Sequence, residues 1–105
     1  MSNAVLIISF KLNEGVSKDV FLNASQNVFN EVISRQKGYI SWKQLYDGKT
    51  WVDLCTFETM DDLNKFKELS RTPNELAKKF YSFMNPFSCK VRIYSVEKEH
   101  RHSKR

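Results

Sequence analysis

One acidic residue, Asp53, stands in a segment that otherwise has the composition of a buried strand, Trp51–Phe57. Alternation along a strand places Asp53 on the same face as Trp51 and Phe57. An ionised carboxylate among aromatic side chains is costly unless it is paired or neutralised. In an aromatic cavity such a carboxyl group would have a raised pKa and could take a proton from a phenol or an enol. Asp53 is therefore the candidate catalytic residue. The alternative is a structural acid that pairs with a Lys, an Arg or a backbone amide.

The side chains expected around Asp53 come from a neighbouring strand and from a helix. Asp47-Gly48 is a strong hairpin signal, and it joins a strand over residues 39–46 to the strand that carries Asp53. The expected register puts Ile40, Trp42 and Gln44 on the Asp53 face. Aromatic residues at such positions can equally belong to the core. The predicted substrate-binding residues are Trp42, Gln44, Trp51, Phe57 and Tyr81.

Nucleophilic and metal chemistry lack the residues that they need. Both histidines, His100 and His102, follow the last predicted strand, so neither a Ser-His nor a Cys-His pair is expected. Cys55 and Cys89 show no CxxC or Cys/His spacing and are expected to be reduced, buried thiols. No glycine motif for a nucleotide is present. We therefore expect no metal and no cofactor.

Length and composition indicate one globular domain. The 105 residues are 41% hydrophobic and 28% charged, which suits a single modest core. The longest apolar run, Ala4–Ile8, is too short for a membrane span, and no secretory signal is recognisable. We therefore expect a cytoplasmic protein that has no membrane partner.

The net charge of +5 is concentrated at one end of the chain. Residues 100–105 contain three Lys or Arg and no acid. We predict a domain over residues 1–98 and a basic, flexible tail over residues 99–105, with no nucleic-acid partner. Phosphate binding through this tail is the alternative.

Hydrophobic periodicity and turn signals predict the element order βαββαβ. This is the ferredoxin-like α+β fold with an antiparallel four-stranded sheet. The first helix is expected to begin after Ser17 and to end at Gly38, and a second helical region to open at Thr59 and restart at Thr72-Pro73. The strands are expected over residues 4–12, 39–46, 51–57 and 87–98.

One subunit by itself would leave a face of this sheet bare. Two helices can cover only one face, whereas Val52 and Leu54 make the opposite face apolar as well. A large exposed apolar patch is typical of an interface. We therefore predict a homodimer whose sheets pack face to face.

The element order, the step Phe57-Glu58-Thr59 and the helix restart at Thr72-Pro73 resemble the antibiotic biosynthesis monooxygenase family, in the dimeric α/β-barrel group. The resemblance covers about Val5 to Val96. It implies a homodimer with a ligand cavity in each subunit between sheet and helices. The family commonly has Trp-Glu-Ser where this chain has Phe57-Glu58-Thr59. Asp53 stands where quinone-forming members have an Asn that helps to hold the substrate. Haem-degrading members use a helix histidine, which is missing from the helices expected here.

The resemblance and the candidate residues lead to two hypotheses. In the first, the protein is a cofactor-independent, monooxygenase-like enzyme that acts on a small planar phenolic or polyketide-like compound, with Asp53 as base or anchor. In the second, it is a non-catalytic small-molecule-binding or stress-related dimeric barrel in which Asp53 is structural.

Overall fold

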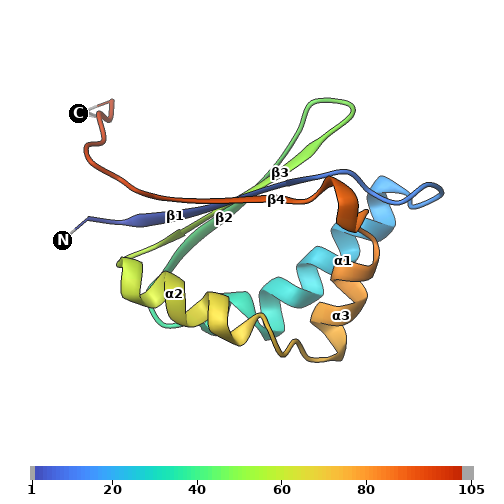
Figure 1. The fold of residues 1–105 in the computed structure, drawn as a ribbon, viewed down its shortest axis with the longest axis horizontal. Helices are drawn as coiled ribbons and strands as arrows, with labels where there is room; N and C mark the ends of the chain where they lie inside the picture. Colours follow the sequence, from blue (N-terminus) through green and yellow to red (C-terminus); the bar gives the residue numbers. More distant parts are fainter. Residues whose placement is uncertain (1, 103–105) are drawn as a thin grey trace.

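The computed structural model describes residues 2–102, which form an antiparallel four-stranded sheet with all helices on one face (Figure 1). The strand order in the sheet is β2-β3-β1-β4. The predicted ferredoxin-like α+β fold is confirmed, with the second helical region divided into two helices. The elements are β1 (Ala4–Phe10), α1 (Lys18–Glu31), η1 (Ile33–Arg35), β2 (Tyr39–Tyr46), β3 (Trp51–Phe57), α2 (Met60–Leu69), α3 (Glu75–Ser82), η2 (Pro86–Ser88) and β4 (Lys90–Ser95).

A side-chain cap begins each of the three α-helices. Ser17 Oγ and Thr59 Oγ1 each accept a backbone N–H at 3.1 Å, at the two positions that the sequence predicts. The predicted cap of α3, Thr72, is wrong: Asn74 Oδ1 accepts the N–H of the third residue beyond it at 2.9 Å. Asn caps a helix at least as well as Thr does, and Pro73 therefore precedes the helix instead of starting it.

The end of α1 also differs from the prediction. α1 ends at Glu31 and a 3₁₀ turn follows, so Gly38 does not terminate the helix. Gly38 instead lies directly before β2 and has φ +77°, a conformation that favours glycine. Its carbonyl oxygen accepts the N–H of Glu58 at 2.7 Å. A Cβ atom at this position would collide with the carboxyl group of Asp62.

We expect Gly38→Ala to destabilise the protein more than Gly48→Ala does. Both glycines have positive φ, +77° and +97°, so alanine costs about 1–2 kcal/mol at either position. Only at Gly38 does the added Cβ meet other atoms, and such overpacking adds about 1–3 kcal/mol. Equilibrium unfolding in urea measures both variants. Asp62→Ala in the Gly38→Ala background should recover only part of the difference, because it removes the carboxyl group but keeps the Asp62 Cβ, which lies 2.8 Å from the added atom. Equal losses in the two single variants would contradict the close contact.

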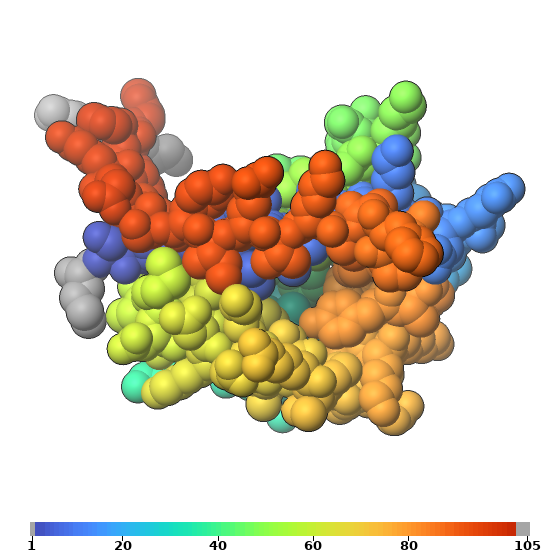
Figure 2. Space-filling model, in the orientation of Figure 1, coloured from blue at the N-terminus to red at the C-terminus, as the bar shows by residue number. Residues whose placement is uncertain are grey.

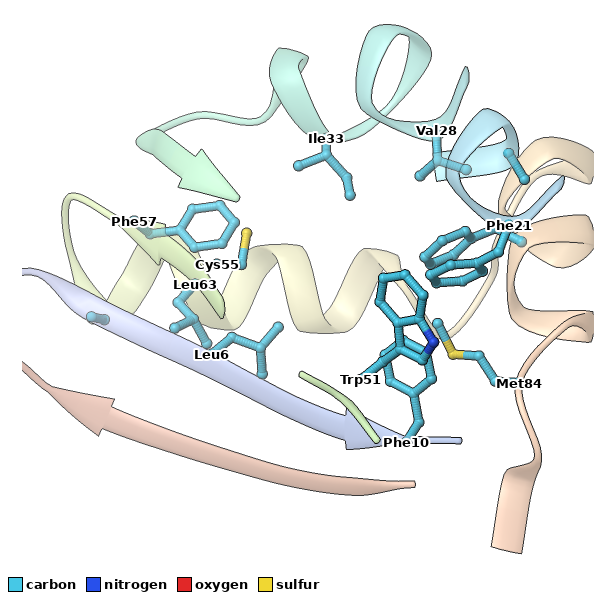
Figure 3. Packing of buried hydrophobic residues seen from close by; sticks show 13 residues of the cluster. Leu6, Phe10, Phe21, Val28, Ile33, Trp51, Cys55, Phe57, Leu63 and Met84 are labelled. Atoms are coloured by element: carbon cyan, nitrogen blue, oxygen red, sulfur yellow. The ribbon is translucent and has the colours of Figure 1, made fainter. Parts of the chain in front are cut away.

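The core between sheet and helices consists of two groups of side chains (Figure 3). At one end Trp51 packs against Phe21, with ring centroids 4.9 Å apart. At the other end Phe57 packs against Phe66 at 5.4 Å. Trp51 and Phe57 thus anchor the two ends of β3, and Asp53 lies between them. The two groups contain Phe10, Phe21, Trp51 and Met84 at one end and Leu6, Cys55, Phe57 and Leu63 at the other.

The register of β2 departs from the prediction at its first residues. A bulge between Tyr39 and Ser41 places Tyr39 opposite Phe57, where the prediction has Ile40 on that face. The Tyr39 and Phe57 rings lie 6.3 Å apart. One extra residue reverses the alternation of side chains locally. Beyond the bulge the register is the expected one, and Gln44 pairs with Asp53.

The second face of the sheet carries no helix in the single chain (Figure 1). Its centre is formed by four half-buried apolar side chains, and charged residues lie on the outer strands β2 and β4. The prediction that the helices cover only one face is therefore confirmed. The apolar centre consists of Val5, Ile7, Val52 and Leu54, and the charged residues are Lys43, Lys90 and Arg92.

Beyond β4 the chain forms neither helix nor strand up to residue 102. Of the predicted basic tail over residues 99–105, residues 103–105 lie outside the described part. Within residues 2–102 the longest helix has 14 residues, and every helix is too short to cross a membrane.

Candidate functional site

Asp53 lies in the middle of β3, faces the helices and is only 5% exposed. Ile8 of β1 and Gln44 of β2 are its cross-strand neighbours. Among residues 2–102, Oδ1 of Asp53 has no hydrogen-bond partner, and no ion pair includes this carboxyl group. The structure therefore does not provide the Lys, Arg or backbone partner that a structural role for Asp53 requires.

Burial raises the pKa of Asp53 to about 7. The side chains of Trp42 and Gln44 can donate N–H groups toward the carboxyl group, and they lower the pKa by a smaller amount. At neutral pH the carboxyl group is consequently present in both its protonated and its ionised form. This is the condition in which a general base can take a proton and later return it.

A cavity of about 250 Å³ lies against Asp53, between the sheet and the helices. Figure 2 shows the molecule hollowed between β4, α2 and α3, each of which supplies part of the cavity wall. Trp42 and Tyr81 line the cavity together with Asp53. Trp42 packs edge-on against Phe80, with ring centroids 5.8 Å apart, so two aromatic rings form one wall. The main apolar lining consists of Leu6, Ile8, Ile33, Phe66, Phe80 and Met84.

A second cavity, of about 180 Å³, adjoins the first. The two share Phe66 of α2, Tyr81 of α3 and Ser70, the residue that follows α2. The second cavity extends to Thr72 and Pro73 in the connection between α2 and α3. The two cavities thus lie side by side between this connection and Asp53.

Three of the six predicted site residues, Trp42, Asp53 and Tyr81, meet in the first cavity. Gln44 lies beside Asp53 but faces a different depression, where its Nε2 donates to Ser25 Oγ at 2.8 Å. Ser25 is buried and in turn donates to a backbone carbonyl of α1 at 2.9 Å. Gln44 is thus tied to α1 and does not line the cavity.

Trp51 and Phe57, the remaining two predicted residues, lie in the core and do not line the cavity. They are 4% and 0% exposed. Phe21 and Tyr46 enclose the indole of Trp51, with centroid separations of 4.9 and 4.6 Å. Both side chains lie on the helical face of the sheet, as Asp53 does. Side chains of the helices pack on the two ends of β3, whereas the middle of the strand borders the cavity.

Sequence reasoning missed Phe66, Phe80 and Ser70 as cavity residues. Phe66 and Phe80 belong to the apolar stripe of the helices, and nothing in that stripe separates cavity lining from core. Ser70 follows the last residue of α2, where no sequence signal indicates contact with Asp53 or its surroundings.

The pKa values of Tyr81 and Cys55 are raised by burial and, to a smaller extent, by the charge of Asp53. For Cys55 the pKa rises to about 12, so its thiol stays protonated and is not a nucleophile at neutral pH. The Tyr81 hydroxyl likewise stays protonated and can donate a hydrogen bond.

Cys89 is exposed, contrary to the prediction, because it precedes β4 instead of lying within the strand. In the part of the chain that the structure describes, no three His, Cys, Asp or Glu residues gather as a metal site would require.

Neither a protein-family model nor a curated protein matches this chain. Solved structures, however, match over nearly its whole length. A dimeric ferredoxin-like protein from an uncultured marine organism superimposes with a TM-score of 0.74 at 15% identity, covering 98% of this chain and 95% of the other. SnoaB, a cofactor-independent oxygenase from Streptomyces nogalater, gives 0.72 at 10% identity, covering 94% and 97%.

A third similar structure is a monooxygenase from Streptomyces coelicolor in complex with the ligand nanaomycin D. It has a TM-score of 0.64 and 14% identity, and the match covers 97% of this chain and 94% of that one. At such identities the comparisons establish the fold. The expected resemblance to antibiotic biosynthesis monooxygenases and to dimeric ferredoxin-like proteins is confirmed as a likeness of fold.

Proposed function

We propose that this protein is a cofactor-independent monooxygenase that binds a small planar phenolic or polyketide-like compound beside Asp53. The observation that carries the proposal is a buried carboxyl group without a partner for Oδ1, which faces an aromatic cavity and has a pKa of about 7. The likeness of fold to a cofactor-independent oxygenase and to a monooxygenase that binds nanaomycin D supports it.

The proposed reaction begins when Asp53 takes the proton of a phenol or enol. The resulting anion is electron-rich, and dioxygen adds to one of its ring carbons to form a peroxide. Asp53 returns its proton to the peroxide, and loss of water leaves a quinone, so one oxygen atom enters the product and the other becomes water. Trp42 and Phe80 would hold the planar ring, and the Tyr81 hydroxyl would donate to a ligand oxygen.

A thermal-shift screen with planar phenols, naphthols, anthrones and quinones is the first test. A ligand at about a hundred times its Kd stabilises the folded state by roughly 2.7 kcal/mol. Each kcal/mol raises the Tm of a domain of this size by roughly 4–8 °C. The compound with the largest shift is then supplied to the protein in an oxygen electrode with a chelator present. Oxygen uptake with formation of the quinone supports the proposal, whereas tight binding without uptake favours the non-catalytic binding protein.

We also infer that two copies of the chain pack through their bare sheet faces. Val5, Ile7, Val52 and Leu54 form an apolar centre that no helix covers, and such a patch is typical of an interface. A similar structure is that of a dimeric ferredoxin-like protein.

Leu54→Glu should convert the homodimer to a monomer, because it places a charge in the centre of the apolar face. Size-exclusion chromatography with light scattering measures the mass, and circular dichroism checks that the variant is folded. Leu76→Glu is the matched control, since Leu76 is 37% exposed on α3, on the helical side of the molecule. A folded Leu54→Glu variant that retains the dimer mass would reject this face as the interface.

A further inference from the structure

We infer that the cavity beside Asp53 accepts neutral compounds and excludes those that carry a carboxylate or a similar negative charge. The inference rests on the proposed function for the phenolic class of the substrate. It narrows that class to phenols that have no carboxyl group or whose carboxyl group is esterified. A reaction that removes or esterifies any carboxyl group must therefore precede the step that this protein catalyses.

The walls of the two adjoining cavities contain no positive side chain. Among the described residues that line them, none is Lys, Arg or His. The ionisable groups in these walls are the Asp53 carboxyl, the Tyr81 phenol and the thiols of Cys55 and Cys89. A carboxylate on a ligand would find no counter-charge there, and an unpaired charge is costly to bury.

The single charged group that such a ligand would meet is Asp53, which repels it. Asp53 is 5% exposed, and no ion pair among residues 2–102 includes its carboxyl group, so no neighbouring cation of the described chain offsets its charge. Two carboxyl groups that share a site cannot both ionise readily, and one must keep its proton. A carboxylated compound that entered would therefore hold Asp53 in its protonated form and remove the base.

A neutral phenol has the opposite effect on the same group. Its O–H can donate to the unpartnered Oδ1 of Asp53, and its oxygen can accept a hydrogen bond from the Tyr81 hydroxyl. Size does not explain the exclusion, because a methyl ester is larger than the acid from which it is made, and the two must fit the same cavity of about 250 Å³. Charge is what separates the two kinds of ligand.

The test compares 2-naphthol, 6-hydroxy-2-naphthoate and the methyl ester of that acid, with Kd measured by isothermal titration calorimetry at neutral to mildly basic pH. The ester matches the acid in shape but carries no charge. We expect the naphthol and the ester to bind similarly and the acid to bind about a hundred-fold more weakly, as two charges in one partly screened site require. In Asp53→Asn the affinity for the acid should move toward that for the ester, because the repulsion is removed while the missing counter-charge remains.

A second variant keeps the test decisive if Asp53→Asn folds poorly. Ser70 lies in the shared wall of both cavities, so Ser70→Lys supplies a counter-charge. It should tighten the binding of the acid relative to that of the ester, so the ratio of the two Kd values is the quantity to compare with wild type. Equal affinities of wild type for acid and ester would overturn the inference, as would exclusion of the acid that persists in both variants.

Binding of the neutral probes without oxygen uptake would refute the proposed reaction and leave the charge selection intact. If none of the three compounds binds, the proposed reaction and the charge selection are both rejected.

Discussion

Asp53→Asn should lower turnover by about 10²–10⁴-fold, the usual contribution of a general base. The amide keeps the shape of the carboxyl group but cannot take the phenolic proton. Oxygen uptake is measured with the phenol that gives the largest thermal shift, at a saturating concentration. Because the neutral Asn still fills the space of Asp53 in β3, the fold and the dimer should persist.

Asp62→Asn is the matched control for this loss. Asp62 is the other buried acid in the described chain, 7% exposed, and it lies in α2 away from the cavity lining. Its variant should retain the turnover of the wild type. If Asp53→Asn also retained full turnover, Asp53 would not be the base.

The stability of the protein should fall between about pH 4 and pH 7 by on the order of 4 kcal/mol because of Asp53 alone. Burial raises its pKa in the folded state from 3.8 to about 7, and each pKa unit corresponds to about 1.4 kcal/mol. Below pH 4 the carboxyl group is protonated in both states, so it exerts no penalty. As the pH rises, the unfolded chain releases this proton first, which favours unfolding until the folded state also ionises near pH 7.

Urea unfolding of wild type and Asp53→Asn across this pH range isolates the effect, because every other titrating group is shared and cancels in the difference. The free energy of unfolding of the wild type, minus that of the variant, should decrease as the pH rises and level off above pH 7. An acid held by a cation or by backbone amides would show the opposite slope, and its replacement by Asn would cost roughly 3–5 kcal/mol. A difference that stays constant with pH would show that Asp53 titrates normally.

The loss of turnover and the change in stability in Asp53→Asn have the same physical cause. Burial of the carboxyl group without a cation reduces stability at neutral pH, and the same burial gives the group a pKa suited to proton transfer. The loss of turnover and the gain in stability above pH 7 should therefore appear in the same variant.

The sequence by itself determined the elements and the side of the sheet to which Asp53 belongs. Alternation along β3 is a local property, so Asp53 had to share a face with Trp51 and Phe57. The caps at Ser17 and Thr59 are local as well, because each side chain bonds a backbone N–H three residues away. The bare apolar face could also be predicted, because two helical regions can cover only one face of a four-stranded sheet.

Only the tertiary structure decided which residues of that face line a cavity. Trp51 and Phe57 are enclosed by helical side chains, whereas Trp42 and Tyr81 remain at the opening beside Asp53. That division depends on where α2 and α3 lie on the sheet, and a periodicity of two or 3.6 residues carries no information about it. The absence of a partner for Oδ1 of Asp53 is likewise a property of every side chain around it, since a missing contact can be recognised only once all neighbours are in place.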